Sequence, residues 1–94
     1  GYDKEDIEMM LGMFLNKIDN QLETVDKAIQ EEDYHTIFTT CHAIRGSTAN
    51  IGLDEARDIA KILELAARNE EVIDYRENFS LLRGLIEEIK GSIG

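Results

Sequence analysis

The chain has 94 residues, no proline, a hydrophobic share of 43% and a formal net charge of −10. This length suits one domain with a single modest core and is too short for two domains. The charge opposes binding to nucleic acid or to an anionic membrane, because both repel an acidic protein. The apolar runs are too short to span a bilayer, and no basic and then apolar leader is present. We therefore expect a soluble, cytoplasmic domain at residues 1–94. The start at Gly1 also fits a domain excised from a larger protein.

The first predicted helix spans about residues 4–30. Asp3 precedes it as a suitable N-cap, and the acidic residues of the first turn complement the helix dipole. Its apolar residues recur at steps of three and four, the pattern of a helix that buries one face. The stripe consists of Ile7, Leu11, Phe14, Ile18, Leu22, Val25 and Ile29. Residues 31–33 then form a short polar break.

Two shorter helices follow, at about residues 34–51 and 54–69. Gly52 ends the first in the position where a helix often needs a left-handed residue, and Asp54 is a candidate cap for the second. The buried stripe of the first is predicted as Tyr34, Ile37, Phe38, Cys41, Ile44, Thr48 and Ile51. That of the second is Ala56, Ile59, Ala60, Leu63, Ala66 and Ala67, whose alanines imply close packing.

The fourth predicted helix spans about residues 72–92. Its heptad-like seam is Val72, Tyr75, Phe79, Leu82, Ile86, Ile89 and Ile93. Helices joined by connections this short must fold back on one another, so we expect an all-α, antiparallel up-down four-helix bundle. No predicted outer face is apolar enough to require a dimer, which favours a monomer. The single cysteine, Cys41, is expected to be a small core residue.

His42 is the residue that indicates chemistry. Successive residues of a helix point about 100° apart, so His42 faces outward if Cys41 faces the core. Its neighbours on that face are all small: Thr39, Ala43, Gly46 and Ala49. Glycine inside a helix costs about 1 kcal/mol relative to alanine, and close approach by another molecule is a reason to accept that cost at Gly46.

The surroundings of His42 suit a phosphoryl group. Neutral imidazole is a nucleophile, and its phosphorylated form carries about two negative charges that call for nearby cations. Arg45 lies three residues on and can donate a pair of N–H groups to phosphoryl oxygens. All twenty Asp and Glu lie in residues 3–33 and 54–88, so residues 34–53 carry no competing carboxylate.

The run from His42 to Gly52 resembles the His-x-x-Lys-Gly signature of histidine-containing phosphotransfer (HPt) domains, and the likeness extends over nearly the whole chain. The resemblance implies a four-helix bundle in which His42 accepts phosphoryl from a receiver-domain aspartate and passes it to another receiver. Arg45 stands where the family usually has lysine, and Gly46 matches the glycine that leaves the histidine open. By the same match Glu64 orients the ring, and Lys61, one turn earlier, adds positive charge.

The resemblance also fixes what the domain needs. It implies a phosphoryl carrier rather than an enzyme, with receiver domains of response regulators or of a hybrid kinase as partners. It also fits a domain excised from a larger hybrid sensor kinase. The chain then needs no cofactor or metal of its own, since Mg²⁺ belongs to the receiver. Glu32-x-x-His35 has the spacing of a di-iron ligand pair, but such bundles need a second copy and two further glutamates. His35 is assigned no chemistry.

Simpler roles remain open for the residues around the histidine. Arg45 could pair with Asp19 or Asp26 across the bundle. Glu64 could pair with Arg68 at the i+4 position.

Two other functions also remain. One is the amino-terminal phosphotransfer domain of a chemotaxis-type kinase, in which a kinase domain of the same protein phosphorylates His42. The other is an adaptor bundle that is never phosphorylated and works without the imidazole.

Overall fold

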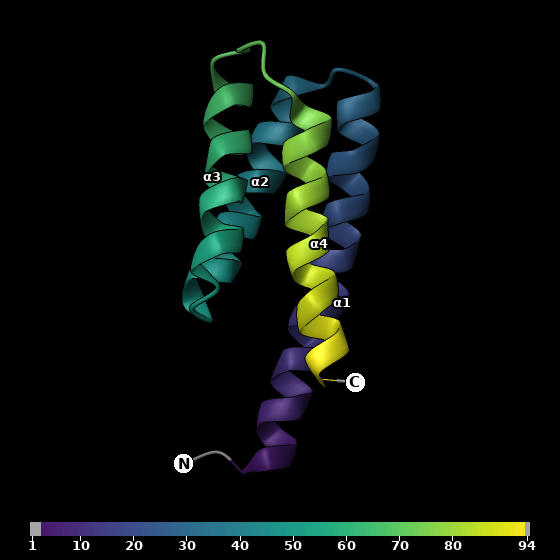
Figure 1. The fold of residues 1–94 in the computed structure, drawn as a ribbon, viewed down its shortest axis with the longest axis vertical. Coiled ribbons are helices and arrows are strands. Elements are labelled where there is room, and N and C mark those ends of the chain that lie inside the picture. The colour runs from purple at the N-terminus through teal and green to yellow at the C-terminus, as the bar shows by residue number, and fades with distance from the viewer. Residues whose placement is uncertain (1–2, 94) are drawn as a thin grey trace.

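The computed structural model describes residues 3–93 and contains four helices. They are α1 (Lys4–Gln30), α2 (Tyr34–Asn50), α3 (Asp54–Arg68) and α4 (Tyr75–Ile93). Figure 1 shows that each helix reverses the direction of the one before it and that the four lie side by side. Contacts join α1 to α2, α2 to α3, α3 to α4 and α4 back to α1. The predicted all-α four-helix bundle is confirmed.

Aspartate side chains begin three of the helices. Asp3 accepts a hydrogen bond from the backbone N–H of Asp6 at 2.9 Å, as predicted. Asp33 and Asp74 accept equivalent bonds at the starts of α2 and α4. The prediction that Asp54 caps α3 was wrong. Leu53 holds the cap position without a side-chain bond, and Asp54 is already helical.

The helix ends agree with the prediction to within one residue for α1, α2 and α3. Gly52 has the expected left-handed backbone, with φ of 77°. Glu32 and Glu70 adopt the same conformation after α1 and α3, with φ of 54° and 50°. A polar, non-glycine residue gives little warning of such a turn.

The predicted start of α4 at residue 72 was wrong. Val72 is 99% exposed and lies in the connection, and the helix begins three residues later, after its cap Asp74. Val72 fits the heptad spacing by chance, whereas the capping aspartate marks the true boundary. The side chain of Ile93, the last predicted seam position, lies outside the described part of the chain.

The core is made from the middle of each apolar stripe. Its members include Ile18, Leu22 and Val25 of α1, Ile37, Cys41 and Ile44 of α2, Ala60 and Leu63 of α3, and Phe79, Leu82 and Ile86 of α4. Cys41 is fully buried, as expected, and desolvation raises the pKa of its thiol to about 12. The thiol is therefore a packing group rather than a nucleophile.

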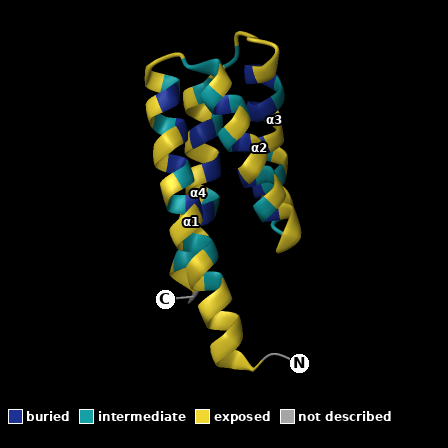
Figure 2. Ribbon diagram, turned by 180° about the vertical axis from the view of Figure 1, so that it is seen from behind, coloured by how far each residue is buried: buried dark blue, intermediate teal, exposed yellow. Residues whose placement is uncertain are grey.

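The first part of α1 extends past the rest of the bundle (Figure 1). With 27 residues, α1 is much longer than α2 or α3, so its beginning has no neighbour on most sides. Figure 2 shows this end as exposed. We call residues 4–13 the α1 overhang. Ile7, which the stripe placed in the core, is 49% exposed, so that prediction was wrong at its first position.

Candidate functional site

His42 lies in the middle of α2 and points away from the core. The residue before it, Cys41, is fully buried, and the turn of the helix brings the His42 side chain to 61% exposure. The predicted outward position is therefore confirmed. The Phe38 ring, one turn earlier, lies 6.5 Å from the imidazole, centroid to centroid. Phe38 was predicted only as a core residue. Its position four residues before His42 also lets its ring lie beside the imidazole while it packs against the core.

A buried carboxylate from α3 contacts the imidazole. Nδ1 of His42 lies 3.1 Å from Oε2 of Glu64, whose side chain is only 5% exposed. In the neutral ring, Nδ1 then carries the proton and donates it to the carboxylate, because an ionised carboxylate only accepts. This leaves the lone pair on Nε2, the nitrogen away from Glu64.

The second oxygen of Glu64 faces Arg45. Nε of Arg45 lies 3.1 Å from Oε1, and the Arg45 side chain is 31% exposed. Oε1 is buried and accepts no well-aligned hydrogen bond from the described residues, so the contact is mainly the attraction of opposite charges. One carboxylate therefore holds the imidazole with one oxygen and the guanidinium with the other.

The simpler pairings of these residues were wrong. Asp19 pairs with Lys90, and Asp26 pairs with Arg76 and Arg83, so both aspartates serve the contact between α1 and α4. Glu64 does not pair with Arg68, because its position on α3 turns it toward α2 rather than along its own helix.

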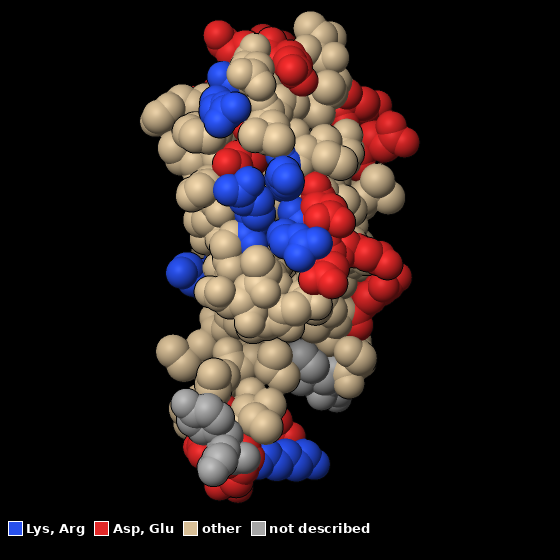
Figure 3. Space-filling model, turned by 90° about the vertical axis from the view of Figure 1, so that its left-hand side faces the viewer, with Lys and Arg blue, Asp and Glu red and all other residues tan. Residues whose placement is uncertain are grey.

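Positive charge gathers on the side of the bundle where α3 lies, as Figure 3 shows. The Lys and Arg of α2 and α3 are Arg45, Arg57, Lys61 and Arg68. Arg57 is paired with Asp54 and Asp58, so its charge is largely balanced. Lys61 is exposed and makes no ion pair within residues 3–93. The chain is strongly acidic as a whole, yet this face carries a cation that can meet an anionic ligand.

The small residues beside His42 leave its surroundings open. Thr39, Ala43, Gly46 and Ala49 are all exposed. A Cβ added to Gly46 would meet nothing within 4 Å, so no neighbour among the described residues requires glycine there. The cost of glycine inside a helix thus has no explanation within the described fold. An approaching molecule would supply one.

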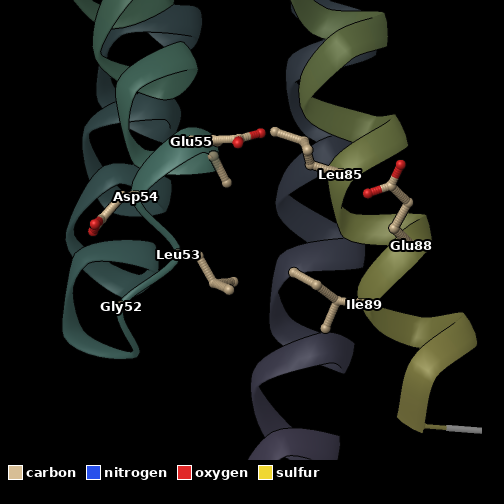
Figure 4. Close-up of a pocket in the computed structure, with 8 residues that line it drawn as sticks. Gly52, Leu53, Asp54, Glu55, Leu85, Glu88 and Ile89 are labelled. Atoms are coloured by element: carbon tan, nitrogen blue, oxygen red, sulfur yellow. The ribbon is translucent and has the colours of Figure 1, made fainter.

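Other features of the described chain offer no competing chemistry. The pocket of Figure 4 does not include His42. It lies at the end of the bundle where α2 turns into α3, and there Leu53 faces Leu85 and Ile89 of α4. It holds no histidine or cysteine. Residues 3–93 contain no group of three or more His, Cys, Asp or Glu placed to bind a metal. No helix among them is long and apolar enough to cross a membrane.

Comparison with known proteins identifies the family. The family model of the Hpt domain matches residues 9–92, which is nearly the whole chain and includes His42, Arg45 and Glu64. Neither the curated proteins nor the solved structures include a match to the chain.

Proposed function

Because the chain belongs to the Hpt domain family, whose members carry phosphoryl groups on histidine in two-component phosphorelays, we propose that His42 is its phosphoacceptor. It takes the group from an aspartate of one receiver domain and passes it to an aspartate of another. The observation that carries this proposal is the exposed imidazole with Nδ1 on buried Glu64. That contact leaves Nε2 as the nucleophilic nitrogen of an exposed ring.

The transfer needs no proton to leave the imidazole. Nε2 attacks the phosphorus of the aspartyl phosphate in line, the N–P bond forms, and the bond from phosphorus to the aspartate oxygen breaks. The aspartate leaves as a carboxylate, and the ring becomes positively charged with its proton still on Nδ1. Glu64 stabilises that positive charge as it develops, as a buried carboxylate does for other reacting imidazoles. The reverse sequence delivers the phosphoryl group to the next receiver.

Arg45 is proposed to balance the negative charge of the phosphoryl group. A guanidinium has five N–H donors, more than its contact with Glu64 can occupy, so donors remain for phosphoryl oxygens. Glu64 fixes the stem of Arg45, which limits the entropy lost on binding. Lys61 would add a second positive charge from α3.

Docking is proposed to use the face around Thr39, Ala43, Gly46 and Ala49, with adjoining parts of α1 and α3. The interface would be modest and transient, as suits a carrier that must leave each partner. All the groups invoked come from one chain, so a monomer is the unit that carries phosphoryl. We expect this in the cytoplasm, with no nucleic acid partner, no cofactor of its own, and Mg²⁺ held by the receiver.

One specific contact also favours a second candidate. A glutamate on the third helix beside the histidine fits the resemblance to the amino-terminal domain of a chemotaxis-type kinase, and Glu64 occupies that place. In that case the donor is ATP bound to a kinase domain rather than a receiver.

Phosphotransfer from a labelled receiver tests the proposal. Wild type should take the label, and His42→Gln should take none. His35→Gln, which removes the only other histidine, is the matched control and should behave as wild type. Equal labelling of wild type and His42→Gln would exclude His42 as the acceptor. Labelling only by a kinase domain with ATP would favour the second candidate.

A further inference from the structure

The α1 overhang carries apolar side chains that the rest of the described chain leaves largely uncovered. Met9, Met10 and Met13 are 65%, 55% and 67% exposed, and residues 3–10 are all exposed. Figures 1 and 2 show this part of the helix beyond the other three. Most helical stability in proteins comes from the packing of an apolar face, which this first part of α1 largely lacks. The sequence favoured a monomer because no predicted outer face was apolar enough to require a dimer. The exposed methionines of the overhang form such a face.

One face of this segment has a self-complementary order. Asp6, Met10, Met13 and Lys17, which we call the methionine stripe, are spaced by four, three and four residues, as in the seam of a coiled coil. All four are exposed. Asp6 and Lys17 form no ion pair with any other residue of the described chain. The stripe therefore has an acid at one end, a base at the other and two methionines between them.

We propose that the methionine stripe binds the same stripe of a second copy, in an antiparallel arrangement about a two-fold axis. In that register Met10 of each copy opposes Met13 of the other, and Asp6 opposes Lys17. Each contact occurs twice, as an isologous interface requires. In this one arrangement the methionines cover one another and each charge meets an opposite charge. No other protein is needed to provide these contacts.

The charge order argues for a second copy over an unrelated apolar partner. An apolar partner would cover the methionines but leave Asp6 and Lys17 at the border without opposite charges. The stripe spans only about three helical turns, so the contact falls at the small end of protein interfaces, where association is weak and reversible. The high net negative charge weakens it further. The dimer therefore forms at high protein concentration, independently of whether His42 carries phosphoryl.

Sedimentation equilibrium of the full chain against concentration tests this inference. The wild-type mass should rise above 10.7 kDa as the concentration approaches about 1 mM, as expected for a small interface. Lys17→Glu and Asp6→Lys should each weaken association at least about tenfold, because like charges then face each other. The double variant, which exchanges the two charges, should restore it. Lys27→Glu makes the same charge change on the same helix outside the stripe and should change little.

A wild type that stays at 10.7 kDa throughout that range would overturn the proposal. So would single variants that associate like wild type, or a double variant that does not recover. The stripe lies outside the core, so each variant should fold as wild type does. Circular dichroism of each variant checks this. Met10→Glu gives an independent check, since a charge in the apolar layer should also keep the chain monomeric.

Discussion

On the α2–α3 face, a carboxylate that is 5% exposed meets both an imidazole and a guanidinium, and the small residues around them stay open. At the α1 overhang, by contrast, three methionines are more than half exposed, and the rest of the described chain covers little of them. Burial holds the first region in one geometry and positions a reactive nitrogen. The second is a surface with unsatisfied apolar groups. Each exposed region of one small bundle is thus suited to a different kind of contact.

Glu64 is the residue whose loss should damage the α2–α3 face most. Glu64→Gln keeps the shape but removes the charge, so phosphotransfer should slow on the order of 10- to 100-fold, the range seen when a carboxylate that orients a metal-binding imidazole is lost. Unfolding free energy should fall by about 1–2 kcal/mol, because Arg45 loses its ion partner while staying partly solvated. Transfer kinetics and urea titration measure both effects.

The matched control is Glu55→Gln, an exposed glutamate on the same helix with no ion partner in the described chain. It should leave transfer unchanged and lower the unfolding free energy by only about 0.3–0.5 kcal/mol, because one negative charge leaves the first turn of α3. Transfer by Glu64→Gln at the wild-type rate would show that the imidazole needs no carboxylate to orient it.

Gly46 should separate stability from function. Gly46→Ala should stabilise the fold by about 0.5–1 kcal/mol, because the position is helical and its Cβ meets open space. Gly46→Leu should keep the helix but slow transfer on the order of tenfold or more, since a misplaced donor loses the alignment that transfer requires. Thermal unfolding and transfer assays report the two effects. Unimpaired transfer by Gly46→Leu would remove the docking argument for this glycine.

Arg45→Lys should have a smaller effect. The charge remains, but the planar set of donors is lost, so transfer should slow by about threefold to tenfold. Combining it with Glu64→Gln in a double-mutant cycle should give a coupling energy of about 1 kcal/mol, as for residues in direct contact. Additive effects would mean that the contact between Arg45 and Glu64 does not position the guanidinium.

The smallest effect is expected on the opposite side, between α1 and α4. A hydrogen bond from Arg76 lowers the pKa of Asp26 below its usual 3.8, with further help from the charges of Arg76 and Arg83. A lowered folded-state pKa gives stability that is present above the unfolded value and is lost as pH falls through the folded one. Asp26→Asn should therefore cost about 0.5 kcal/mol at pH 7 and nothing in strong acid. Urea titrations at both pH values test this, and an equal loss in acid would contradict it.

Local patterns in the sequence predicted most of the fold. The middle positions of the four apolar stripes, the Asp3 cap and the left-handed Gly52 depend on residues close together in the chain, and all three appear in the structure. The stripes were wrong at their ends, where Ile7 and Ile51 are exposed. A local pattern also gave the wrong start for α4. Val72 has the heptad spacing of the seam but is exposed in the connection before the helix.

The site could be predicted only in part. The outward azimuth of His42 follows from helix geometry alone. The contact of Glu64 with both His42 and Arg45 depends on how α3 rotates against α2, and a helical pattern allows an Arg68 partner equally well. The exposure of the overhang likewise depends on where α2 and α3 end in space, which the stripe of α1 does not encode.

The position of the phosphoryl group on the imidazole tests the central claim most directly. Nitrogen-15 and phosphorus-31 NMR of the chain, after transfer from a phosphorylated receiver, identifies the bonded nitrogen. The account predicts a single phosphoryl group on Nε2 of His42, with the proton on Nδ1 facing Glu64. A phosphoryl group on Nδ1, or on any other residue, would contradict it.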